Sequence, residues 1–250
     1  MFNRFILSPI FLTLSVISYY FARDNTLLFS LISTISFWAF IILILPNSFY
    51  TFLRNLIIKF KKSKLFWVIF IIYMLYHVIL YSFFFYLLSP GSITTLHFSL
   101  SVNAGIGYSI PPPLPYFLQW VSTSPAIWFF IGPYEGDIIP FSTFIGVTLA
   151  ILIGLNAAEI GELWGVSKRS IIIVPSLGLI SGSSCCIFLP SIVMYSIALS
   201  VTSVTAIILS ILSSFTYFVI AYYGLPIIST IVLFHNLKLL DKLLYKIKEK

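Results

Sequence analysis

Apolar residues in this chain occur in long runs, and turn residues or charged residues interrupt the runs at only a few places. Most of the runs approach or exceed the roughly 20 residues that an α-helix needs to cross a bilayer. The pattern predicts six membrane-spanning helices, at residues 5–22, 26–45, 65–88, 141–158, 171–194 and 205–234. The uncharged stretch 170–236 has room for two or three spans, and two keep the lysines that follow it on the side of the other basic residues.

The basic residues orient these spans. All 14 Lys and Arg residues except Arg23 fall on one side of the membrane, and none occurs between Lys64 and Lys168. Lys and Arg in short loops mark the cytoplasmic side. We therefore expect an all-α, polytopic helical bundle in the cell membrane. It would form a single transmembrane domain over residues 1–250, with both termini in the cytoplasm.

Composition supports a membrane protein. Only 8% of the residues are charged and 60% are hydrophobic, whereas about 25% of residues are charged in soluble proteins. Membrane lipid is therefore the expected environment. The net charge of +7 is explained by the cytoplasmic loops. It permits direct contact with nucleic acid, but no motif indicates such contact.

Several segments outside the spans have patterns of their own. Residues 89–140 are rich in proline, which breaks helices, and in Trp and Tyr, which favour the headgroup level. They predict an external cap with short interfacial helices, such as residues 125–131. The tail, residues 237–250, is predicted to be a basic amphipathic helix on the cytoplasmic surface. Another interfacial helix is predicted before the third span, from the helical spacing of Phe52, Leu53, Leu56, Ile57 and Phe60.

The fifth span contains the motif with the most specific chemistry. Gly178 and Gly182 form a GxxxG pair, which lets helices approach closely, and Cys185 and Cys186 follow on the same side. Thiolates suit soft metals such as Cu(I) or Hg(II), or thiol exchange. Cys is also a small apolar packing residue, so both roles remain open. Pro190 ends the motif and can break the helix.

This run, about residues 177–191, resembles the metal-contacting span of mercuric-ion transport membrane proteins and of uncharacterised archaeal membrane proteins. The resemblance implies that Cys185 and Cys186 receive a metal ion and that Pro190 is the helix breaker. In size and topology the chain is also similar to the polytopic subunit of the archaeal DNA-import (Ced) apparatus.

Other polar residues of the spans offer fewer possibilities. His77 lies near the middle of the third span, where an ionisable group is either functional or hydrogen-bonded to a neighbouring helix. Ser203 and Ser210 belong to a seam of hydroxyl residues that suits helix packing or a wetted path. A cytoplasmic turn is expected to hold Glu159 and Glu162, and only Glu159, near Asn156, can reach inward.

These observations favour a membrane subunit of a transport or translocation apparatus, a pore or scaffold component that acts with other membrane subunits or as a homo-oligomer. Its cargo could be a macromolecule such as DNA. Two alternatives remain: a soft-metal or thiol-redox protein using Cys185 and Cys186, and a structural subunit of a respiratory complex. An enzyme and a resident cofactor are not expected, because no catalytic or haem-binding constellation is present. With so few charges inside the spans, we do not expect a self-sufficient ion-driven pump.

Overall fold

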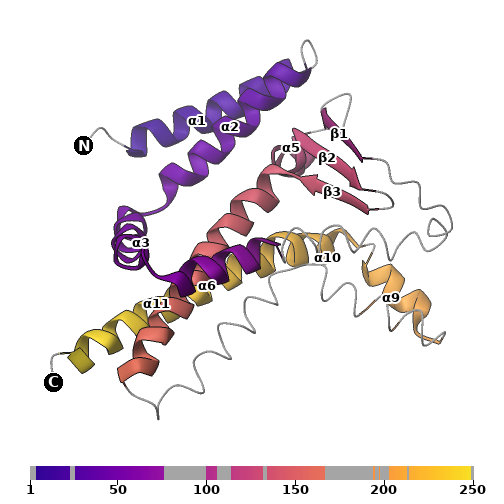
Figure 1. The fold of residues 1–250 in the computed structure, drawn as a ribbon. Helices are drawn as coiled ribbons and strands as arrows, with labels where there is room; N and C mark the ends of the chain where they lie inside the picture. Colours follow the sequence, from indigo (N-terminus) through magenta and orange to yellow (C-terminus); the bar gives the residue numbers. More distant parts are fainter. Residues whose placement is uncertain are drawn as a thin grey trace. The chain divides into compact units, whose positions relative to one another are not determined.

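The computed structural model describes residues 4–22, 26–75, 100–105, 114–131, 134–166, 194, 197, 203–212 and 214–248. Helices dominate this part of the chain, as the sequence predicts (Figure 1). The chain divides into two compact units. The first unit comprises Met1–Asn55 and Phe85–Phe144, and the second comprises Leu56–Phe84 and Ile145–Lys250.

The first unit begins with a helical hairpin. The bounds of helices α1 (Arg4–Phe21) and α2 (Thr26–Ile44) agree within one residue with the first two predicted spans. The two helices pack against each other (Figure 1). At their contact the Ser15 hydroxyl donates to the Ser33 carbonyl oxygen at 2.7 Å. The Ser33 hydroxyl donates to the Ser15 carbonyl oxygen at 2.9 Å. Small hydroxyl residues let two helix backbones approach closely enough for such reciprocal bonds.

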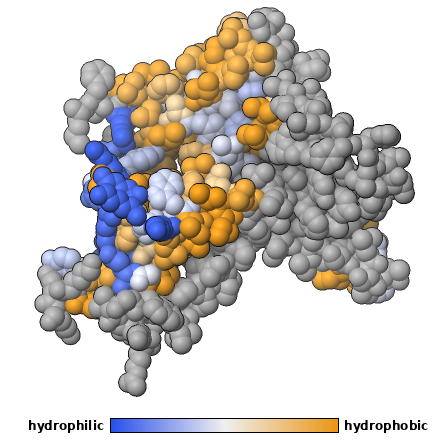
Figure 2. Space-filling model, in the orientation of Figure 1, coloured by the Kyte–Doolittle hydropathy of each residue, from blue (hydrophilic) through white to orange (hydrophobic). Residues whose placement is uncertain are grey.

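The hairpin buries hydroxyl groups and exposes hydrocarbon. Its buried polar side chains are Ser8, Ser15, Ser18, Ser30, Ser33, Thr34 and Ser36. The large apolar side chains at its surface include Ile6, Ile10, Leu14, Ile17, Leu27, Leu28, Leu31 and Ile35. Figure 2 shows this hydrophobic surface over the hairpin, at the top of the view. A soluble helix pair has the opposite arrangement, with its apolar stripe facing inward.

The predicted cap contains a β-sheet, so the all-α prediction is incomplete. Three antiparallel strands, β1 (Leu100–Gly105), β2 (Ala126–Ile131) and β3 (Tyr134–Ile138), pair in that order. The interfacial helix predicted at residues 125–131 is wrong, because β2 occupies this segment. Its sequence, AIWFFI, consists mainly of β-branched and aromatic residues, which favour strands.

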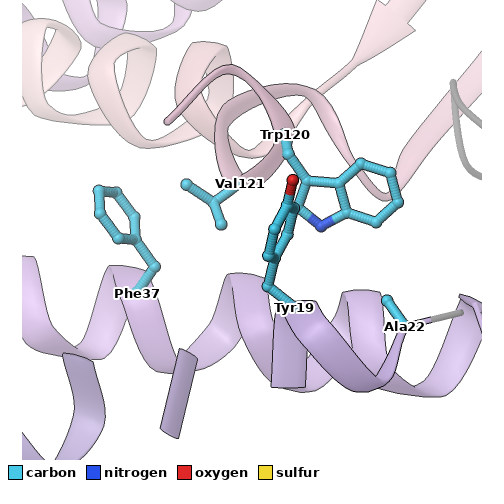
Figure 3. Packing of buried hydrophobic residues seen from close by; sticks show 5 residues of the cluster. All are labelled: Tyr19, Ala22, Phe37, Trp120 and Val121. Atoms are coloured by element: carbon cyan, nitrogen blue, oxygen red, sulfur yellow. The ribbon is translucent and has the colours of Figure 1, made fainter. Parts of the chain in front are cut away.

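A short helix of the cap packs on the hairpin. The 3-10 turn η2 (Leu114–Tyr116) leads into α5 (Phe117–Thr123), whose Trp120 and Val121 lie against Tyr19 and Phe37 (Figure 3). The Trp38 indole N–H donates to the Val121 carbonyl oxygen at 3.0 Å, and the Thr34 hydroxyl donates to the Ser124 carbonyl oxygen. These bonds satisfy carbonyl groups at the end of α5 that have no partner inside the helix.

Helix α3 (Asn47–Phe60) agrees with the predicted helix before the third span, and its Leu56 and Phe60 are buried. A turn at residues 61–63 joins it to the helix Lys64–Leu75, the described part of the third span. The backbone N–H of Phe66 donates to the Ser63 hydroxyl at 3.4 Å, as expected at a helix start. The end of α3 and the start of this helix both belong to the second unit.

Helix α6 (Pro140–Val166) continues eight residues past the predicted end of the fourth span at residue 158. The prediction that Glu159 and Glu162 lie in a turn is therefore wrong, because both are helical. Alanine, glutamate and leucine dominate residues 155–163, and their high helix propensity carries the helix through these charges. Among the described residues, two helical segments, Leu27–Ile44 and Pro140–Leu163, are long and apolar enough to cross a membrane.

The sixth predicted span is divided into several helical pieces. Helices α9 (Thr205–Leu212) and α10 (Phe215–Val219) precede a π-helical turn, η3 (Ile220–Gly224), and then α11 (Leu225–Lys248). The π turn ends at Gly224, two residues before Pro226, which lacks the backbone N–H that a helix needs. A π turn is a common way to absorb such a disturbance. Helix α11 continues without interruption into the predicted tail as far as Lys248.

Candidate functional site

The second unit contains a seam of buried residues between α6 and α11. On α6 the buried side chains recur every three or four residues, at Leu149, Leu152, Asn156, Glu159 and Leu163. On α11 they recur at Leu233, Leu237, Leu240 and Leu244. This spacing places each set on one helix face. Leu163 packs against Leu240 and Leu244 at one end of the seam. Two polar residues of α6 therefore lie in an otherwise hydrophobic contact.

Asparagine side chains join the two helices within this seam. The Asn156 amide nitrogen donates to the Leu152 carbonyl oxygen at 2.7 Å on its own helix and to the Leu233 carbonyl oxygen at 3.1 Å on α11. The Asn236 amide nitrogen donates to the Asn156 side-chain oxygen at 2.8 Å. Both amides are thus used, which is the usual requirement for polar groups inside a protein.

One turn further along α6, a single lysine faces three carboxylates. Lys59 Nζ, at the end of α3, lies 2.8 Å from Glu159 Oε1, 3.4 Å from Glu162 Oε2 and 3.8 Å from Asp241 Oδ1. The cluster thereby joins α3, α6 and α11. In these described ion pairs, one ammonium group is shared by three carboxyl groups.

Burial differs sharply between the members of this cluster. The Glu159 side chain has no exposed surface, whereas those of Lys59, Glu162 and Asp241 are 32%, 37% and 41% exposed. Glu159 Oε1 accepts the hydrogen bond from Lys59, and Oε2 has no hydrogen-bond partner in the described structure. An acceptor buried without a partner is uncommon and costs free energy. We therefore take the Glu159 carboxyl as the candidate functional group.

Lys59 remains charged in these surroundings. Partial burial by itself would lower the pKa of its ammonium group. The hydrogen bond and the charge of Glu159, with the charge of Glu162, outweigh this effect and raise the pKa of Lys59 above its ordinary value. The ammonium group is thus held as the permanent cation of the cluster.

Most of the site residues predicted from the sequence lie outside the described residues. These are His77 in the third span and Gly178, Gly182, Cys185, Cys186 and Pro190 in the fifth. Ser203 and Ser210 are described, and both are exposed. The Ser210 hydroxyl donates to the Ile207 carbonyl oxygen of its own helix at 2.7 Å. A role of these two serines in helix packing stays a prediction.

Sequence analysis identified Glu159 and Asn156 but missed their partners. The clearest local signal is Lys59, which stands between Leu56 and Phe60, the two buried residues of α3. Asp241 similarly lies beside Leu240 and three residues before Leu244, both of which are buried. A charged residue next to a buried helix face is a candidate for a buried ion pair, because isolated charges are not buried.

Comparisons with protein-family models, with curated proteins and with solved structures found no match. In the described ranges no group of three or more His, Cys, Asp and Glu side chains is arranged to hold a metal ion. The function is therefore argued from the geometry of the helices and of the charged cluster.

Proposed function

We propose that this chain is a multi-pass subunit of a transport or translocation apparatus in the cell membrane, and that it acts with partner subunits. The observation that carries the membrane location is the hairpin of α1 and α2, which buries seven hydroxyl side chains and exposes large aliphatic ones. In water such a surface would favour aggregation or association. In lipid it is the expected arrangement, because small polar residues join helices and hydrocarbon faces the acyl chains.

The charged cluster supports a transport role over a purely structural one. Glu159 lies within the apolar segment Pro140–Leu163 and is completely buried. Ionisable residues in membrane helices are expensive, and they commonly mark transport pathways or coupling sites. The cluster also contains an ionisable pair, Lys59 and Glu159, which was not expected from the sequence. It contains only one buried carboxyl, which fits a subunit of a larger assembly.

The first test concerns topology. In a chain with Cys185→Ser and Cys186→Ser, single cysteines at Lys61 and Lys246 should react with a membrane-impermeant maleimide only after the membrane is opened. Both positions are exposed and are predicted to be cytoplasmic. The matched control is Leu118→Cys in α5, an exposed position in the predicted external cap, which should react in intact cells. Labelling of Lys61→Cys from outside would contradict the proposed topology.

The second test concerns partners. After extraction in mild detergent, the protein should purify with other membrane proteins or as an oligomer, with a protein mass above the 28.3 kDa of one chain. Native mass spectrometry measures this mass. Tryptophan at Ile10 of α1 or Ile35 of α2 should then show which exposed face meets another subunit, because lipid accommodates added bulk more readily than a packed helix does. A single chain that by itself catalyses ion-coupled uptake in liposomes would refute the proposal.

A further inference from the structure

The strongest unexplained feature of the molecule is the free oxygen of Glu159. The side chain is fully buried, its Oε1 is bonded to Lys59 and its Oε2 has no hydrogen bond in the described structure. An ionised carboxylate accepts hydrogen bonds at both oxygens, whereas a protonated one carries an O–H on one of them. In the described structure, only one of the two carboxyl oxygens of Glu159 therefore accepts a hydrogen bond.

The described ionisable side chains around Glu159 come from three helices. Lys59 approaches it from α3, Glu162 lies on its own helix and Asp241 approaches the same lysine from α11. The nearby amides of Asn156 and Asn236 bond to each other and to helix carbonyl groups. Among the described ion pairs, Lys59 is shared by three carboxylates, and burial penalises the ionised form of Glu159.

We propose that the Glu159 carboxyl is a proton-binding site of this subunit, filled and emptied through the exposed rim of the charged cluster. On binding, a hydronium ion at the rim gives up its proton, an O–H bond forms at Glu159 Oε2 and water is left behind. Lys59 keeps its own protons and remains paired with Glu162 and Asp241. This inference rests on the proposed function, since it names the ion that the membrane subunit would respond to.

The exposure of the cluster members provides the route for the proton. Glu162 and Asp241 each have more than a third of the side chain exposed, and Lys59 has nearly a third. Glu162 Oε2 and Asp241 Oδ1 each lie within 4 Å of Lys59 Nζ, which also contacts Glu159 Oε1. Positioned ionisable side chains of this kind can pass a proton between water and a buried carboxyl. Lys59 Nζ already contacts all three carboxylates. We therefore expect the site to bind a proton rather than a metal ion.

Protonation of Glu159 weakens one specific contact. A neutral carboxylic acid holds an ammonium group less strongly than a carboxylate does, because the attraction between opposite charges is lost even though Oε1 can still accept the hydrogen bond. The tie between the end of α3 and α6 would then depend on Glu162, at 3.4 Å, and on the link to α11 through Asp241, at 3.8 Å. Proton binding therefore changes the junction of three helices.

Infrared difference spectroscopy of the full-length protein in liposomes tests this proposal. Between about pH 8 and about pH 5, acidification should produce a carboxylic acid C=O band that is absent from Glu159→Gln. Lys59→Met should move the midpoint of this band to higher pH by about one unit, a tenfold gain in proton affinity. Asp241→Asn should move it in the opposite direction, since it removes a negative charge. Glu162→Gln should keep the band.

The proposal is overturned if the wild-type protein shows no such band, or if Glu159→Gln retains it. It is also overturned if the midpoint depends on sodium concentration at constant ionic strength, because the site would then bind sodium. If Glu159→Gln does not fold, the opposite shifts in Lys59→Met and Asp241→Asn still decide the matter. Cysteine labelling reports the membrane location separately, so failure of the proton site and failure of the proposed function are distinguishable.

Discussion

Replacing Lys59 with methionine should destabilise the protein by about 3 kcal/mol, the cost of leaving a buried carboxylate without its partner. Glu159 is fully buried and its shortest charged contact, 2.8 Å, is to this lysine. Adding Glu159→Leu to Lys59→Met should restore most of the loss, because a buried ion pair can be exchanged for hydrocarbon with little effect on stability. Thermal unfolding of the purified variants in detergent measures both effects.

The pH dependence of this loss provides a second readout. In Lys59→Met a proton on Glu159 neutralises the orphaned charge, so the difference from wild type should shrink as the pH falls. At high pH the change in wild-type stability depends on Lys59, whose pKa is raised above its ordinary value of 10.5. The stability that Lys59 contributes is complete below pH 10.5, and it is lost only as the pH rises through the folded-state pKa of Lys59. Lys62→Met, at an exposed position in the adjacent turn, is the control and should change stability little. Equal losses in the two methionine variants would contradict the importance of the pair.

Local signals made the first three helices predictable. The hairpin helices α1 and α2 begin and end within a residue of the predicted spans, since a long apolar run bounded by charged or turn residues is read directly from the sequence. Helix α3 was predictable from the spacing of its apolar residues. The sheet of the cap was not, because β2 contains a continuous apolar run without the alternation that identifies a half-buried strand.

The charged cluster depends on contacts that no local pattern contains. Lys59 and Glu159 are 100 residues apart in the sequence, and Asp241 comes from a third helix. Glu159 was expected in a turn because charges usually mark the end of a membrane span. It is helical because the residues around it have high helix propensity, and Lys59 compensates its charge within the second unit. The sequence thus identified the inward-facing carboxylate, and tertiary structure supplied the cation that makes its burial tolerable.

Replacing Gly154 with leucine should disrupt the packing of α6 on the helix Lys64–Leu75. A Cβ atom at this position would lie 3.0 Å from Phe66 Cδ2 and 3.1 Å from the Phe66 carbonyl oxygen. The ring can rotate, but the backbone carbonyl of the helix Lys64–Leu75 cannot move without displacing that helix. We expect a loss of at least about 3 kcal/mol in the free energy of unfolding, the upper range for overpacking, and a smaller loss for Gly154→Ala.

Gly224→Ala is the matched control, since its Cβ would meet only Ile220 Cγ2, at 3.9 Å. Thermal unfolding should rank the three variants in this order, and Phe66→Ala should rescue Gly154→Leu only in part, because the carbonyl remains. Wild-type stability in Gly154→Leu would show that the helix Lys64–Leu75 does not pack on α6 at this glycine.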